Sequence, residues 1–173
     1  MSDEKIIIDP DEDDGMASES AVPRKKTLRI VTFSLGRENY CVPLDQAKEV
    51  IQPSDITQVP NSPDFIAGII NLNGEIVAIL DIRIFFGLGE EEKSKDRRIL
   101  ITDVTGSCVG IMVDRVKAIA EIEEESIQPP LATLKGKLAE YTKGEVQMGE
   151  DIVALLDLAK ILNNEAINNL RKG

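Results

Sequence analysis

The stretch FIAGIINLNGEIVAILDI, residues 65–82, places two apolar runs on either side of an Asn-Gly pair. Asn73-Gly74 between such runs is the strongest short-range hairpin signal, because a type I′ turn needs positive φ at both central residues. The second run ends at Asp81, which can cap a helical turn that Gly87 closes. The stretch therefore predicts a β-hairpin followed by a short helix.

The same pattern occurs again near the end of the chain. GEIVAILDI (residues 74–82) matches EDIVALLDL (residues 150–158) without a gap. The same offset aligns two further pairs, Phe65 with Tyr141 and Gly68 with Gly144. Chance similarity among aliphatic strands could explain any one of these matches, so further blocks are needed.

Two further blocks, upstream of these, also match between the halves. Arg29-Ile30-Val31 matches Arg98-Ile99-Leu100, and Asp45-x-x-Lys48 matches Asp114-x-x-Lys117. Because several blocks agree in the same order, we infer an internal duplication with halves at about residues 28–88 and 97–165.

Other local patterns predict further strands, loops and helices in the two halves. Alternating or apolar runs predict strands at residues 28–35, 40–44, 98–104 and 108–113. Pro43 marks a strand end or an edge, and Asp45 can cap a helical turn through residues 46–50. Charged residues 90–96 predict a loop, and residues 121–130 an irregular connection. A final helix is expected from Asp157 to Lys172, with one stripe formed by Leu158, Ile161, Leu162, Glu165/Ala166 and Leu170.

Composition limits the class of protein. The chain has 173 residues, a net charge of −11, 3% aromatic residues and no Trp. Ile, Leu and Val must therefore build the core. The acidic balance argues against binding to nucleic acid or to anionic lipid, which lysine and arginine would favour. No apolar run reaches the roughly 18 residues of a membrane helix. A cytoplasmic protein is expected.

The first 26 residues differ from the rest. Residues 9–14 hold five acids, and the apolar Ile6-Ile7-Ile8 stands alone. Such a segment buries too little surface to offset its ordering entropy, which predicts a disordered acidic tail over residues 1–26. The alternative is that Ile6-Ile7-Ile8 docks as an edge strand or as a peptide on a partner.

The chain contains no His, which removes the commonest general base and metal ligand. Neither a phosphate-binding glycine motif nor a metal-binding spacing occurs, so no cofactor is expected. Asp81 and Asp157 could form an acid–base pair, but each precedes a helical pattern, where aspartate serves as an N-cap. Cys41 and Cys108 allow one disulfide, although two buried thiols suit a reducing cytosol better.

Several of these segments resemble the CheW-type coupling proteins of bacterial chemotaxis. The resemblance covers about residues 27–165 and rests on AKEVIQP (residues 47–53), ITQVPNSPDFIAGIINLNG (56–74), ILDIR (79–83) and VGIMVDRV (109–116). It implies a mainly β fold of two side-by-side five-stranded SH3-like barrels with short helices and a C-terminal helix. It also implies a non-catalytic adaptor that couples methyl-accepting chemotaxis receptors to a CheA-type histidine kinase.

The resemblance implies partners and contact residues as well. The partners are the kinase regulatory domain, met at the barrel ends, and the cytoplasmic receptor tip, met in an apolar groove between the barrels. The protein is expected to be a monomer in isolation and to be recruited to receptor arrays. The protein-binding positions carried over are Ala47, Glu49, Gly68, Asn73, Ile119 and Gly144. For the two glycines, a purely backbone role is an equal alternative.

One position departs from the family pattern. The family usually has Asn-Leu-Arg-Gly, whereas this chain has Asn71-Leu72-Asn73-Gly74. Asn73 suits the hairpin turn but cannot replace the charge of an arginine. The standard receptor contact is therefore in doubt. An alternative function is a divergent scaffold in a non-flagellar pathway, such as twitching or developmental signalling, and a nucleic-acid-binding small barrel is a third hypothesis.

Overall fold

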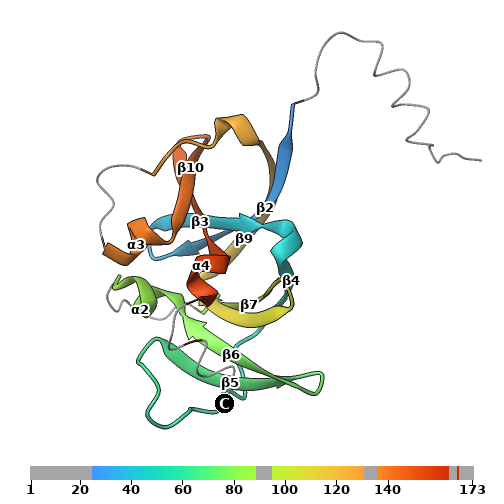
Figure 1. Cartoon of the computed structure of the whole chain (residues 1–173), viewed down its shortest axis with the longest axis vertical. Coiled ribbons are helices and arrows are strands. Elements are labelled where there is room, and N and C mark those ends of the chain that lie inside the picture. Colours follow the sequence, from blue (N-terminus) through green and yellow to red (C-terminus); the bar gives the residue numbers. More distant parts are fainter. Residues whose placement is uncertain (1–24, 89–94, 131–135, 164–166, 168–173) are drawn as a thin grey trace, which may run out of the picture.

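In the part of the chain that the structure describes, ten strands form two five-stranded sheets, one above the other in Figure 1. The computed structural model describes residues 25–88, 95–130, 136–163 and 167. The first sheet, barrel 1, has the order β10 (Thr142–Met148), β11 (Asp151–Leu156), β3 (Glu38–Pro43), β2 (Thr27–Leu35) and β9 (Arg115–Glu123). The second, barrel 2, has the order β4 (Ala47–Ile51), β7 (Arg98–Val104), β8 (Ser107–Val113), β6 (Glu75–Asp81) and β5 (Ile66–Leu72). Both are small SH3-like barrels, as the family resemblance implied.

Each barrel takes strands from both halves of the sequence. The hairpins β2–β3, β5–β6, β7–β8 and β10–β11 form within a half. The strand β4, however, pairs with β7 of the second half, and β9 pairs with β2 of the first. The halves therefore exchange strands, so that neither half forms a barrel alone.

The pairing registers follow the internal duplication. Parallel contacts join β6 to β8 and β3 to β11, with Ile79 opposite Gly110 and Leu155 opposite Cys41. These two pairs are equivalent in the sequence alignment of the halves. The register shifts in β4 and β9 also occur at equivalent places, around Lys48 and Lys117. The two barrels therefore share the same topology and equivalent strand registers.

A short backbone bridge joins the two edges of each barrel. In barrel 2, Thr57 and Ile69 exchange two hydrogen bonds, with N···O distances of 2.9 and 2.8 Å. In barrel 1, Gln128 and Glu145 do the same at 2.7 and 2.8 Å. These bridges connect the segments after β4 and β9 to β5 and β10.

Short helices follow the strands at equivalent places. Asp81 caps α2 (Ile82–Phe86) by accepting from the backbone N–H groups of Arg83 and Ile84, and Gly87 ends it with a φ of 70°. Asp157 caps α4 (Leu158–Leu162) through Lys160 N. Further short helices in the described residues are α3 (Gly136–Glu140), η1 (Leu44–Gln46) and η2 (Glu124–Ser126). The predicted caps Asp81, Gly87 and Asp157 are confirmed.

Two predicted elements are wrong. Residues 46–50 do not form a helical turn capped by Asp45, because η1 ends at Gln46 and the chain continues as the strand β4. Residues 121–123 are not part of an irregular connection, because they are the end of β9. Both strands expose most of their residues, so they lack the apolar alternation that predicts a strand. Residues 1–24 of the predicted tail, most of the 90–96 loop and the predicted helix beyond Asn163, apart from Ile167, lie outside the described residues.

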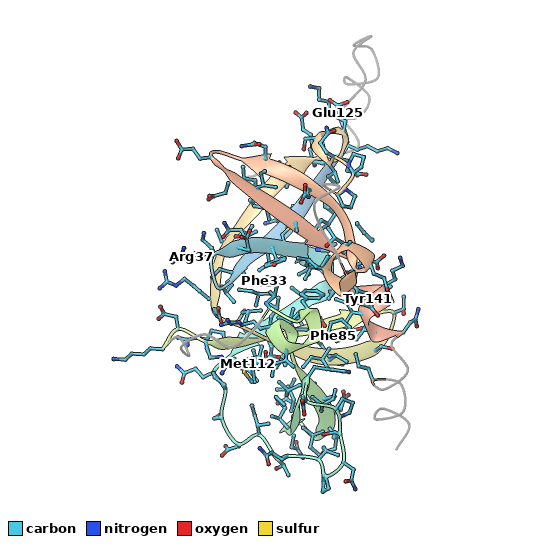
Figure 2. All side chains as sticks on the ribbon, turned by 90° about the vertical axis from the view of Figure 1, so that its left-hand side faces the viewer. Phe33, Arg37, Phe85, Met112, Glu125 and Tyr141 are labelled. Carbon is cyan, nitrogen blue, oxygen red and sulfur yellow. The ribbon has the colours of Figure 1, made fainter. Side chains whose placement is uncertain are left out.

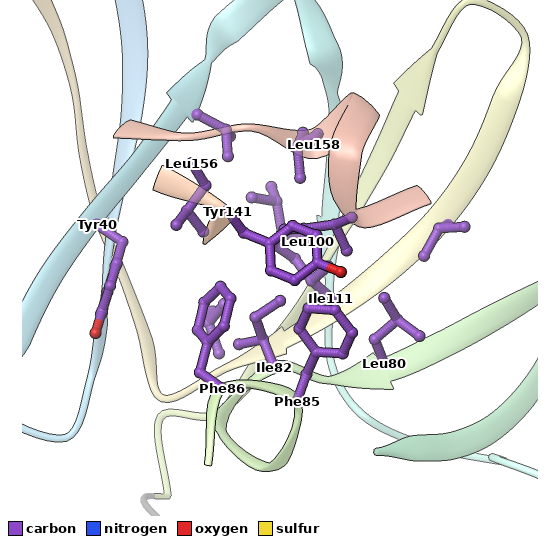
Figure 3. Close-up of a cluster of buried hydrophobic side chains, with 14 of the residues drawn as sticks. Tyr40, Leu80, Ile82, Phe85, Phe86, Leu100, Ile111, Tyr141, Leu156 and Leu158 are labelled. Carbon is purple, nitrogen blue, oxygen red and sulfur yellow. The ribbon is translucent and has the colours of Figure 1, made fainter. Parts of the chain in front are cut away.

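Among the described residues, three clusters of apolar side chains form the core. One lies inside each barrel and is built from aliphatic, Cys and Met side chains. The third, the shared core, lies between the barrels and contains all six aromatic side chains. Phe85 is central to it, with ring centroids 5.0 Å from both Phe65 and Tyr141. Figure 3 shows Phe85 beside Tyr141 in this core. Figure 2 shows Phe33, Phe85 and Tyr141 at the level where the barrels meet. Packing the barrels together therefore supplies the aromatic core that neither interior contains.

Burial of Cys41 inside barrel 1 predicts a loss of stability in alkali. Both cysteines are free thiols, Cys41 buried and Cys108 partly exposed. Burial raises the pKa of Cys41 from 9.0 to about 12. The unfolded thiol loses its proton first, so the stability is complete below pH 9 and falls as the pH rises toward 12. Urea unfolding at pH 8 and pH 10 should show a fall of about 1.4 kcal/mol from this thiol. Cys41→Ala should have a smaller pH dependence, and an unchanged one would contradict this account.

Candidate protein-binding surfaces

The acidic side chains that could suggest catalysis have structural roles. Asp81 and Asp157 each cap a helix, and Asp81 also pairs with Arg97 at 3.3 Å. Within the described ranges, no three His, Cys, Asp or Glu side chains lie together as metal ligands would. Nor is any helix of those ranges long and apolar enough to cross a membrane. The acid–base hypothesis for the two aspartates therefore loses its support.

Exposed aliphatic side chains occur on both barrels at equivalent positions. On barrel 2 these are Val50, 45% exposed, and Ile76, 65% exposed. Their equivalents on barrel 1 are Ile119, 59% exposed, and Ile152, 46% exposed. A single exposed aliphatic residue is ordinary on a protein surface. Exposed aliphatic residues at equivalent positions of both barrels, however, indicate that the two surfaces share a role.

These four exposed side chains lie on the same sheet faces as residues of the shared core. Val50 lies opposite Leu100 and Ile119 lies opposite Val31, and both partners belong to the shared core. Directly opposite residues in paired strands lie on the same face of the sheet. Because side chains alternate along a strand, Ile76 shares the face of Leu80, and Ile152 that of Leu156. We call Val50, Ile76, Ile119 and Ile152 the apolar margin.

Four of the predicted protein-binding residues lie in barrel 2. Ala47 is partly buried against the shared core, and Glu49 is exposed on the same strand, beyond the register shift. Gly68 lies at a register shift in β5 with a φ of 149°. Asn73 is in the β5–β6 turn with a φ of 53°, followed by Gly74 with a φ of 90°, as the hairpin prediction required.

The other two predicted residues lie in barrel 1. Ile119 is on β9 and belongs to the apolar margin. Gly144 lies at a register shift in β10, equivalent to that of Gly68. The six residues are therefore divided between the two barrels.

The two glycines have a clear backbone role. A Cβ added at Gly68 would lie 2.6 Å from Cγ2 of Ile56, and one at Gly144 would lie 2.6 Å from both Cγ2 of Ile127 and the backbone oxygen of Gln128. Each glycine thus lets its strand approach the bridge that joins the barrel edges. This close approach accounts for both glycines without a partner, while contact with a partner stays a prediction.

Three members of the apolar margin, Val50, Ile76 and Ile152, are not among the binding positions that the family pattern predicts. Ile76 and Ile152 are aligned by the gap-free match of residues 74–82 to residues 150–158, and Val50 is aligned with Ile119 by the upstream blocks. The sequence therefore carries a signal for their equivalence. Their exposure depends on the curvature of each sheet and on what covers it, which strand patterns do not show.

Comparison with known proteins agrees with this architecture. A family model described as a CheW-like domain matches residues 29–166. The chemotaxis protein CheW of Treponema pallidum is 31% identical over 147 residues, covering 83% of this chain and 86% of that protein. Protein FrzA of Myxococcus xanthus is 32% identical over 134 residues, covering 75% and 82%.

A solved structure supports the same conclusion. The crystal structure of the scaffolding protein TtCheW from Thermoanaerobacter tengcongensis matches with a TM-score of 0.73 and 32% sequence identity, covering 86% of this chain and 94% of that one. The match extends over both barrels, which together occupy most of the chain. The chain belongs to the CheW-like domain family, whose members are scaffold proteins of chemotaxis signalling.

Proposed function

We propose that this protein is a non-catalytic adaptor that couples methyl-accepting chemotaxis receptors to a CheA-type histidine kinase. It acts in the cytoplasm and is recruited to membrane-bound receptor arrays. Membership of a scaffold family supports a role in chemotaxis signalling, and the apolar margin supports binding to proteins. The observation that carries the proposal is the repetition of exposed aliphatic side chains at equivalent places on two barrels.

An exposed apolar surface is stabilised when a partner protein covers it. Burying an aliphatic side chain that water now contacts stabilises a complex by roughly 25 cal/mol for each Å² of apolar area. Two similar surfaces, one on each barrel, give the chain two places to hold a partner. A protein with two such surfaces and no assembled reactive site in its described part is suited to linking other proteins.

Calorimetry with separate partners tests this proposal. The full chain should bind both the regulatory domain of a CheA-type kinase and a receptor-tip fragment, each with a Kd in the micromolar range, where each tenfold change corresponds to about 1.4 kcal/mol. Binding to neither partner at tens of micromolar would overturn the proposal.

Ile119→Asp should weaken binding to at least one of these partners by tenfold or more. The substitution places a charge in an apolar contact that must be desolvated on binding. The fold should survive, because Ile119 is 59% exposed. Ile84→Asp is the matched control, since Ile84 is also an exposed aliphatic residue, at 36%, but lies on α2 outside the margin. Equal effects of the two substitutions on binding would show that the apolar margin is not part of the binding site.

A further inference from the structure

The strand β9 has a free edge in the described part of the chain. It is the last strand of the barrel 1 sheet, and among the described residues its ladder partner is β2 alone. Such an edge offers backbone N–H and C=O groups to a further strand. Ile119 lies on this strand and is exposed. The edge of β9 therefore combines free backbone groups with an uncovered aliphatic side chain.

Charges of opposite sign lie on either side of Ile119 along the strand. Arg115 and Lys117 precede it, and both are exposed. Glu121 and Glu123 follow it and are exposed as well. The strand β9 is therefore basic where it begins, aliphatic at its centre and acidic where it ends.

The first residues of the chain show the same order of side chains. Lys5 is followed by Ile6-Ile7-Ile8, and Asp9 begins the run of acids at residues 9–14. Isoleucine is β-branched and favours strands. Two segments with the same order of charges bring opposite signs together only when they run antiparallel. Residues 5–11 therefore fit the edge of β9 in one direction.

The charge pairs in this direction are complementary. When the middle isoleucine of the tail lies opposite the exposed one of β9, Asp9 comes opposite Lys117, and Lys5 comes opposite Glu121. Lys117 lies at the register shift of β9, but charges this close attract each other across either face of the strand. In the parallel direction, Lys5 would instead meet Lys117. Asp9 would then meet Glu121, and like charges opposite each other are destabilising.

The same argument fixes the register. A shift of two residues in either direction would place a charged side chain, Lys5 or Asp9, opposite Ile119. A shift of one residue would turn Ile7 to the other face of the sheet. The pairing of Ile7 with Ile119 is therefore the register that matches both charge and hydrophobicity.

The chain is long enough to reach this position. Lys25 Nζ lies 3.5 Å from a carboxylate oxygen of Glu123, and Thr27 is paired with Glu123, so the described chain begins at the acidic end of β9. Residues 9–24 span at most about 50 Å, and β9 from Lys117 to Glu123 is about 20 Å long. Because a short tether holds the two segments at an effective concentration of about 1 mM, weak pairing is enough to keep them together.

We propose that residues 5–11 dock antiparallel to the free edge of β9 in the same chain, with Ile7 against Ile119. The docked segment covers part of the apolar margin, so it competes with a protein that binds there. The competition rests on the proposed adaptor function, whereas the docking does not. The tail then sets the fraction of chains that are open to a partner.

Hydrogen–deuterium exchange of the full chain, followed by mass spectrometry of residues 115–123, tests the docking. Ile7→Asp places a charge against Ile119, so amides on the free edge should exchange about fivefold faster than in the wild-type chain. Asp9→Lys should speed their exchange about threefold in 20 mM NaCl, and less in 300 mM NaCl, where the charges are screened. Asp13→Lys is the matched control. It makes the same change of charge beyond the residues that pair with β9, and should change the exchange less than about twofold.

A charge swap tests the direction and the register. Lys117→Glu should release the tail as Asp9→Lys does, and the bond that Lys117 Nζ donates to Asn39 Oδ1 is an exposed one. The chain with both Asp9→Lys and Lys117→Glu should regain the wild-type protection, because opposite charges face each other again. A purely structural effect of either substitution would not be reversed by the other.

Release of the tail should also strengthen binding to a partner. The apparent Kd rises by the reciprocal of the fraction of chains that are open. Ile7→Asp should therefore bind either the regulatory domain of a CheA-type kinase or a receptor-tip fragment about fivefold more tightly than the wild-type chain does, as measured by calorimetry.

Each part of the inference has a result that contradicts it. Equal exchange in the wild-type chain and in Ile7→Asp would overturn the docking. Protection that increases with the concentration of the chain would mean that the tail docks on a second copy, against the proposal. A double charge swap that failed to restore protection would rule out this register, and unchanged partner binding by Ile7→Asp would rule out the competition. If neither chain bound a partner while the exchange results were as expected, the adaptor function would fall and the docking would stand.

Discussion

Gly68→Ala should lower the free energy of unfolding by about 3 kcal/mol. The new Cβ would meet Cγ2 of Ile56 at 2.6 Å and the backbone oxygen of Thr57 even closer. That oxygen accepts the hydrogen bond of Ile69 N in the bridge between the barrel edges, so backbone must move for the side chain to fit. The φ of 149° adds strain, because side-chain-bearing residues rarely adopt it. Urea unfolding followed by circular dichroism measures the change.

Two other glycines separate the two causes. Gly144→Ala meets a similar close approach, at 2.6 Å to the backbone oxygen of Gln128, but its φ is not in the positive range. Gly149→Ala has a φ of 63° with nothing within 4 Å of the new Cβ. The cost should therefore be largest at Gly68, intermediate at Gly144 and about 1 kcal/mol at Gly149. A cost at Gly68 no greater than at Gly149 would contradict the role of the bridge.

Asp114→Ala should also cost about 3 kcal/mol, because it removes one side of a buried ion pair. The carboxylate Oδ2 accepts from Arg83 Nη1 at 3.3 Å, and the two side chains are only 12% and 9% exposed. The same oxygen accepts from Gly36 N in the β2–β3 turn. Arg83 and Asp114 follow strands of barrel 2, whereas Gly36 belongs to barrel 1, so this carboxylate ties the barrels together.

A second substitution distinguishes charge from packing. In Arg83→Met with Asp114→Ala, the buried charges are removed together, so the double variant should be more stable than the sum of the single effects predicts. Asp114→Asn keeps an acceptor for Gly36 N and should cost less than Asp114→Ala. If Asp114→Ala unfolded at the same midpoint urea concentration as the wild-type chain, the carboxylate would have no part in holding the barrels together.

The elements that the sequence predicts correctly are those with local signals. Asn73-Gly74 specifies its hairpin because few residues tolerate positive φ at both turn positions. Asp81 and Gly87 mark the two ends of α2, since capping depends on residues within one turn. The internal match of residues 74–82 to residues 150–158 likewise predicts that two equivalent β6 and β11 strands exist.

The exchange of strands between the halves has no local signal. Whether β4 pairs with the first or the second half is decided by packing across the shared core, between residues far apart in sequence. Its exposed residues give no alternation that would indicate a strand at all. Val50, Ile76 and Ile152 were not predicted for a related reason. Val50 and Leu100, for example, look alike as sequence, although only Leu100 is covered.

Simultaneous binding tests the central claim most directly. The full chain, the regulatory domain of a CheA-type kinase and a receptor-tip fragment would be mixed at tens of micromolar and separated by size-exclusion chromatography with light scattering. An adaptor with separate surfaces should give a ternary complex containing all three proteins, and the kinase domain and receptor fragment should not form it without the chain. Displacement of one partner by the other, or elution of all three components separately, would contradict the account.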